Sequence, residues 1–238
     1  MRPAAAAGAA LSLWASIALA GPAPADAQLQ PFQASYSWRW HGATVAVSTL
    51  RLEHAGDDDW SYSSNTSPRG LGYLYPMRPA LRSTLHISDQ GVQPLAFKAT
   101  GSGTSHDADV SFDWQAGRAT GVYEGTAVDL ALAPGVQDDL SVQIALMVDL
   151  LHGRTPEHLA MLDRNSIRNY RYQREGSESL ATPLGQIDTI IYSSQHPGSP
   201  RITRFWCAPS RGYIPMRVEQ KRRDSVEWSM DIVSLQRD

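Results

Sequence analysis

The residue types of a serine hydrolase occur in succession at Ser105, His106 and Asp107. A Ser-His-Asp triad passes a proton from the hydroxyl to the imidazole, so its three side chains must converge. The residues that follow alternate between apolar and polar types, which predicts a strand over 106–114. Neighbouring side chains on a strand point to opposite faces, so we interpret the three residues as the start of that strand and not as a triad.

Three carboxylates, Asp107, Asp109 and Asp113, share one face of the same predicted strand. Carboxylates bind hard cations, but the loop and spacing of an EF-hand are missing here. The seven histidines form neither an H-E-x-x-H pattern nor pairs four residues apart. We therefore expect a solvated strand face, with no catalytic residues, no metal and no cofactor, and the sequence favours a protein that is not an enzyme.

An apolar, uncharged segment separates Arg69 from Arg78, where a polar loop would be usual. One interpretation is a flap that folds over an open end of the sheet and covers a helix. The other is a ligand-gating or membrane-touching edge, with arginines that hold an acidic head group. Under the second interpretation the ligand-binding residues are Arg69, Leu71, Tyr73, Leu74, Tyr75, Met77, Arg78 and Arg82.

The N-terminal segment has the pattern of a cleaved secretory signal. Arg2 precedes an apolar stretch over 4–20, and small-residue cleavage sites end at Ala20 and Ala27. The stretch is too short and too weakly flanked for a membrane anchor. We expect cleavage after Ala27, with Ala20 as the alternative, and a single periplasmic domain over 28–238 with no transmembrane segment.

Charge and cysteine content exclude some partners and bonds. The formal net charge of −3 gives the surface no general attraction for nucleic acid or anionic lipid. The basic run at 221–223 is followed by Asp224 and lies between two strand patterns, so we interpret it as a hairpin turn. The single cysteine, Cys207, excludes an intramolecular disulfide, and its apolar strand predicts a small buried side chain.

Period-two alternation recurs along most of the chain. In 32–40 the residues Phe32, Ala34, Tyr36, Trp38 and Trp40 share one face. Similar patterns predict strands over 44–52, 80–88, 92–99, 106–114, 120–132, 158–163, 166–174, 186–193, 201–207, 213–219 and 226–232. Turn signals such as Glu175-Gly176 separate them. This spacing is typical of an antiparallel β protein.

One helix is predicted within "PGVQDDLSVQIALMVDLLHG" (134–153). Asp138 or Asp139 suits its N-cap, and Gly153 suits its C-terminal stop. The helix is apolar around most of its circumference, so it must be buried on more than one side. We therefore expect a mainly β fold: a strongly curved antiparallel sheet or half-barrel wrapped around one buried helix at about 138–152.

Five stretches carry a family resemblance: "PFQASYSW" (31–38), "SFDWQAGRATG" (111–121), "LAPGVQDDLSVQIALMVDL" (132–150), "TPLGQIDT" (182–189) and "FWCAPSRGYIPMRVEQ" (205–220). With these the chain resembles the domain-of-unknown-function 3108 family of exported bacterial proteins. The resemblance implies a periplasmic β-rich domain. It implies no activity, so no catalytic residues carry over from it.

Three functions remain open at this point. The first is a non-enzymatic carrier of an apolar or lipid-like ligand held between the sheet and the helix. The alternative is an envelope-assembly or interaction protein with a filled core, and the third is a glycan-acting enzyme. A cavity of roughly several hundred Å³ beside the helix favours the carrier. A filled core favours the interaction protein, and converging carboxylates in a polar cleft favour the enzyme.

Overall fold

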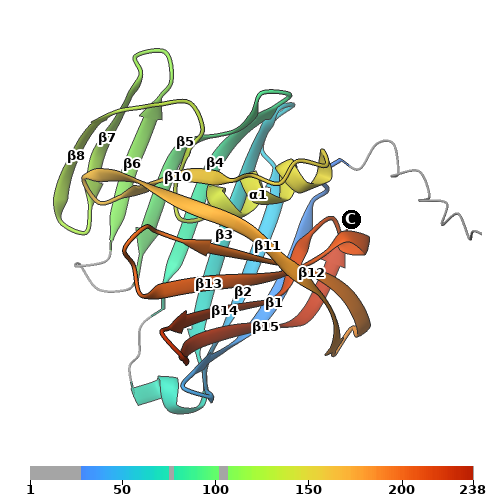
Figure 1. Ribbon diagram of the computed structural model, residues 1–238. Helices are drawn as coiled ribbons and strands as arrows, with labels where there is room; N and C mark the ends of the chain where they lie inside the picture. The colour runs from blue at the N-terminus through green and yellow to red at the C-terminus, as the bar shows by residue number, and fades with distance from the viewer. Residues whose placement is uncertain (1–27, 75–77, 102–106, 238) are drawn as a thin grey trace, which may run out of the picture.

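The computed structural model describes residues 28–74, 78–101 and 107–237, and most of these residues lie in β-strands (Figure 1). The strands are β1 Phe32–Trp40, β2 Ala43–His54, β3 Asp59–Pro68, β4 Ala80–Ser88, β5 Gly91–Thr100, β6 Ala108–Asp113, β7 Arg118–Tyr123, β8 Thr126–Ala131, β9 Val136–Gln137, β10 His158–Asp163, β11 Ser166–Thr182, β12 Gly185–Gln195, β13 Arg201–Ala208, β14 Ile214–Arg222 and β15 Ser225–Arg237. The helical elements are α1 Ser141–Leu151 and the 3-10 turns η1 Gly70–Leu74 and η3 Pro209–Arg211. The predicted signal, 1–27, lies outside the described residues.

All of these strands belong to one sheet of 15 strands, in the order β8-β7-β6-β5-β4-β3-β2-β1-β15-β14-β13-β12-β11-β10-β9. The pairing of β1 with β15 joins two arms, one running from β1 to β8 and the other from β15 back to β9. Neighbouring strands are antiparallel except β9 and β10. The sheet ends at β8 and β9, so it does not close into a barrel.

The sheet bends until its two arms face each other across α1 (Figure 1). The short strand β9 returns to the first arm, where the Gln137 side chain donates a hydrogen bond to the Val92 carbonyl of β5 at 2.8 Å. The predicted architecture, a curved antiparallel sheet around one helix, is confirmed.

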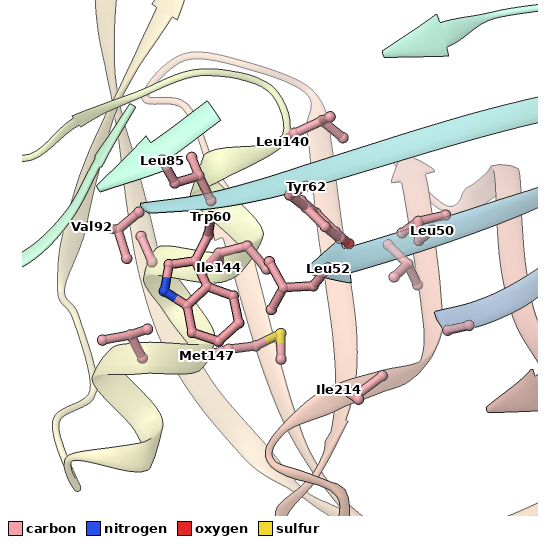
Figure 2. Close-up of a cluster of buried hydrophobic side chains, with 14 of the residues drawn as sticks. Leu50, Leu52, Trp60, Tyr62, Leu85, Val92, Leu140, Ile144, Met147 and Ile214 are labelled. Atoms are coloured by element: carbon pink, nitrogen blue, oxygen red, sulfur yellow. The ribbon is translucent and has the colours of Figure 1, made fainter. Parts of the chain in front are cut away.

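Both arms pack against α1. Figure 2 shows Ile144 and Met147 facing Trp60 and Leu52 of the first arm. On its other side the helix places Leu146 and Leu150 in a second cluster with Tyr172, Tyr192 and Cys207 of the second arm. Burial raises the pKa of the Cys207 thiol, and the prediction of a small buried side chain is confirmed. The burial of the helix on two sides follows from its apolar circumference.

Asp138 sets the beginning of α1, as one of the two predicted caps. Its Oδ1 accepts hydrogen bonds from the backbone N–H groups of Leu140 and Ser141, both at 2.8 Å. The Ser141 hydroxyl accepts one from the Asp138 N–H at 2.7 Å, so the two residues cap each other in the manner of a capping box. At the other end Gly153 has a φ of 71° and stops the helix, as predicted.

Three strand predictions are wrong in detail. The serine-rich strand β3 between β2 and β4 was missed, because its apolar alternation is limited to Trp60 and Tyr62 and small polar side chains follow. The predicted turn at Glu175-Gly176 is a bulge within the continuous strand β11. The single strand predicted over 120–132 is a hairpin, because Glu124 and Gly125 both adopt positive φ and turn the chain between β7 and β8.

Among the described residues no helix is long and apolar enough to cross a membrane.

Replacing Ile144 with alanine should lower the free energy of unfolding by about 2–5 kcal/mol, because the side chain is fully buried between the arms and leaves a cavity. Urea unfolding measures the change. Val122→Ala serves as the control, since Val122 is 47% exposed and its loss should stay within about 0.5 kcal/mol. Equal effects of the two changes would place α1 at the surface.

Candidate functional site

A cavity of about 620 Å³ lies between the N-terminal half of α1 and the two arms. Its lining is mainly apolar and comes from α1 and both arms: Tyr36, Trp38, Val45, Ala46, Leu50, Ser64, Thr66, Pro79, Leu81, Asp139, Leu140, Val142, Gln143, Leu146, Met161, Tyr170, Tyr172, Ser194, Thr203, Phe205, Pro215, Val218, Gln220, Trp228 and Met230. Small-molecule sites typically measure roughly 300–1,000 Å³. The helix therefore fills only part of the space that the curved sheet encloses.

Two tryptophans and their partners form one wall of this cavity. Trp38 and Trp228 lie with their ring centroids 5.1 Å apart. The Trp38 indole donates a hydrogen bond to the Ser48 hydroxyl at 2.6 Å, and the Trp228 indole donates one to Gln220 Oε1 at 3.1 Å. Gln220 in turn donates to Thr203 at 3.2 Å. Because the wall satisfies its own polar groups, it offers the cavity mainly aromatic surface.

The cavity lining extends to the β1–β2 end of the sheet, and we take this end as the mouth of the cavity. A surface depression there is lined by Arg39, Trp40 and His41, and it shares Trp38, Val45, Gln220 and Trp228 with the cavity. Trp40 belongs to the same predicted strand face as Phe32 and Tyr36, yet it is 61% exposed. It lies where β1 projects past the packed core, after a register shift between Trp38 and Arg39.

Among the described residues that line the cavity, Asp139 is the one with a carboxyl side chain. It accepts a hydrogen bond from the Tyr123 hydroxyl of β7. Loss of hydration raises the pKa of Asp139 to about 6; the Tyr123 hydrogen bond opposes this shift, and the charges of Asp138, Asp163 and Glu124 add to it. Asp139 is exposed at the surface and also lines the cavity, so a ligand that fills the cavity changes the surroundings of this carboxyl.

Of the predicted site residues that the structure describes, all but Arg82 lie beside the cavity and not in its lining. Leu71, Tyr73 and Leu74 are exposed on η1, and Arg69 donates a hydrogen bond to the Tyr73 hydroxyl at 3.1 Å. Arg78 is also exposed. The cavity lining includes Thr66 and Pro79, on either side of this segment, which places the segment beside the mouth. Tyr75 and Met77 lie outside the described residues.

Arg82 lies on the outer face of the sheet. Its neighbours on β4 point inward, since Leu81 lines the cavity and Ser83 donates a hydrogen bond to Asp138. The Arg82 guanidinium instead donates to the Ser61 hydroxyl at 3.1 Å. The structure thus separates Arg82 from the cavity, whereas Arg69 flanks the mouth. A ligand-binding role for the predicted residues stays a prediction.

Sequence reasoning missed most of the cavity lining on the second arm, including Tyr170, Tyr172 and Phe205. Their inward direction could be read from alternation, but whether an inward side chain meets the helix or a cavity depends on packing. One signal was present for Asp139. Two consecutive aspartates precede the helix, only one of them can be its N-cap, and the other is left for a different role.

Two of the three carboxylates considered for cation binding have other partners. Asp109 forms an ion pair with Lys98 at 3.2 Å, and Asp113 accepts a hydrogen bond from the Ala116 N–H at 2.8 Å. Ser105 and His106 lie outside the described residues. Within 28–74, 78–101 and 107–237 no group of three or more His, Cys, Asp or Glu residues is placed to hold a metal ion.

Comparison with known proteins gives a family and a fold. The model of the family described as "Protein of unknown function (DUF3108)" matches residues 32–228. A comparison with curated proteins found no match. Among solved structures the fold is similar to a β-barrel-like protein of the domain of unknown function DUF1849 from Brucella abortus, with a TM-score of 0.56 and 10% identity, over 89% of this chain and 99% of that one.

A second solved structure, described as an exported protein with a YmcC-like fold from Bacteroides fragilis, aligns with a TM-score of 0.34 and 9% identity. That alignment covers 87% of this chain and 96% of the other. At these identities the similarity concerns the fold alone, and it rests on the first structure.

Asp139→Asn should change how stability depends on pH. The folded-state pKa of Asp139, about 6, lies above its ordinary value of 3.8, so the folded state holds the proton more tightly. This carboxyl therefore lowers stability progressively as pH rises between those values. The asparagine variant should lose that part of the pH dependence and gain relative stability at neutral pH, as measured by thermal unfolding across the range. Identical pH profiles would show that Asp139 is ordinarily hydrated.

Proposed function

This chain belongs to the DUF3108 family, and since that family assigns no activity, we propose from the cavity itself that the protein binds an apolar, lipid-like ligand without transforming it. The ligand lies between α1 and the two arms. We also propose that the binding domain spans 28–238 and acts in the periplasm after removal of 1–27, as the N-terminal sequence pattern indicates.

The cavity is the observation that carries this proposal. Its volume of about 620 Å³ suits a small molecule, and its lining is mainly apolar. Apolar groups leave water spontaneously, so an apolar ligand gains free energy by filling such a space. The cavity supports this proposal over the interaction-protein alternative, which requires a filled core.

The polar groups of the cavity favour binding over catalysis. Trp228, Gln220 and Thr203 form a chain of hydrogen bonds with each other, and Asp139 is bound to Tyr123. Groups engaged in this way are satisfied within the protein, so they leave an apolar surface for a ligand and do not converge on a reacting atom.

Ala46→Trp tests the proposal, because Ala46 lines the cavity and a larger side chain there occupies the ligand space. Val47→Trp is the matched control, since Val47 is the next residue of β2 and does not line the cavity. The apolar fluorophore N-phenylnaphthylamine serves as the probe. The wild-type protein and Val47→Trp should bind it with similar affinity, and Ala46→Trp should bind at least about tenfold more weakly. Equal affinity of both variants, or no binding by the wild type, would contradict the proposal.

Probe binding should also weaken as pH rises through about 6, the pKa of Asp139. An apolar ligand removes water from this carboxyl and therefore binds better to its neutral form. Titrations on both sides of that pH measure the effect, with Asp139→Asn as the control that should bind equally at both. A wild-type affinity that does not depend on pH would place the ligand away from Asp139.

A further inference from the structure

Exposed apolar side chains gather at the mouth of the cavity. Of the six large hydrophobic residues exposed in the described structure, four lie here: Trp40 at 61%, Leu71 at 60%, Tyr73 at 58% and Leu74 at 74%. Trp40 pairs with Ala43 of β2, and η1 packs on the adjoining residues Thr44 and Val45. Figure 1 shows η1 as the short cyan turn beside the β1–β2 turn at the lower edge. We name these four residues the rim patch.

The backbone holds η1 so that its apolar side chains point outward. The Arg69 N–H donates a hydrogen bond to the Val45 carbonyl at 2.8 Å, and the Gly72 N–H donates one to the Arg69 carbonyl at 2.8 Å. Gly72 lies so close to β2 that a Cβ atom would come within 1.8 Å of the Val45 carbonyl oxygen. The η1 turn is therefore held against β2 by its backbone, and this contact leaves Leu71 and Leu74 exposed.

Positive charge surrounds the rim patch. Arg69 and Arg78 flank it and are exposed, and neither forms an ion pair within the described part of the chain. At the same end of the sheet, the predicted hairpin turn between β14 and β15 carries exposed Arg222 and Arg223 against the single acid Asp224. Arg201 there is already paired with Glu227 at 2.7 Å. Although the formal net charge of the whole chain is −3, this end of the sheet thus carries an excess of positive charge.

From the rim patch and its arginines we infer that the mouth end of the protein docks on the surface of an anionic phospholipid bilayer. Tryptophan and tyrosine favour the interface between lipid and water, and leucine enters the acyl boundary. Arginines nearby attract anionic head groups. The inference deepens the proposed function, because a docked mouth lets a lipid-like ligand pass between bilayer and cavity without crossing water.

Flotation with vesicles tests the docking. Vesicles of equal parts phosphatidylglycerol and phosphatidylcholine should bind the wild-type protein, while pure phosphatidylcholine vesicles and high salt should weaken binding. Leu71→Ser with Leu74→Ser should reduce binding at least about tenfold, because both side chains would enter the interface. Val122→Ser with Val233→Ser is the matched control, as these residues are 47% and 43% exposed on β7 and β15 and should leave binding unchanged.

A second pair of variants tests the charge. Arg69→Gln with Arg78→Gln should remove the preference for phosphatidylglycerol, whereas Arg51→Gln with Arg118→Gln should preserve it, since these exposed arginines lie elsewhere on β2 and β7. Absence of vesicle binding, or equal losses in test and control variants, would overturn the inference. So would a wild-type dimer that the leucine substitutions dissociate, because a second copy would then be the occupant of the patch.

Probe titration separates this inference from the proposed function. The rim variants should bind N-phenylnaphthylamine as the wild type does, since none of the substituted residues lines the cavity. Probe binding without vesicle binding would overturn only the docking. Vesicle binding without probe binding would overturn the carrier function and leave a membrane-attached protein.

Discussion

The buried carboxylate of Asp138 determines where the only long helix of the described chain lies inside the sheet. One oxygen caps α1 through the backbone N–H groups of Leu140 and Ser141, and the other accepts a hydrogen bond from Ser83 of β4 at 2.5 Å. Burial raises the pKa of Asp138 while these hydrogen bonds oppose the shift. A charge without such partners would be too costly at a fully buried position. These hydrogen bonds therefore attach the beginning of the helix to β4 of the first arm.

That position divides the interior of the curved sheet. The buried face of α1 around Ile144 and Met147 fills the space between the arms at one end, as the packing with Trp60 and Leu52 shows (Figure 2). Beyond the first turn of the helix the arms continue, and the described residues form no second α-helix between them. The cavity, its aromatic wall and the apolar rim at its mouth all lie in this remaining space. The packed core, the cavity and the rim patch thus follow one another along the interior of the same curved sheet.

The fold could be predicted further from sequence than the site could. Alternation along residues such as Phe32, Tyr36 and Trp38, together with an all-round apolar helix, is a local signal that survives folding, so the curved sheet around a buried helix was predicted correctly. Whether Asp139 lines a cavity and whether Trp40 is exposed depend on where the two arms, which are distant in sequence, cease to pack against each other. The alternation of a strand predicts whether a side chain points inward or outward. Whether an inward side chain packs in the core or lines a cavity depends on the residues of the opposite arm.

The central claim is that the cavity beside α1 holds an apolar, lipid-like ligand. Native mass spectrometry of the protein purified without detergent from the cells that produce it tests this claim most directly. A bound species should appear in addition to the protein, recovered by lipid extraction as an apolar or lipid-like molecule and absent from Ala46→Trp. A wild-type protein that carries no such molecule, and that takes up none when incubated with a lipid extract of the same cells, would contradict it.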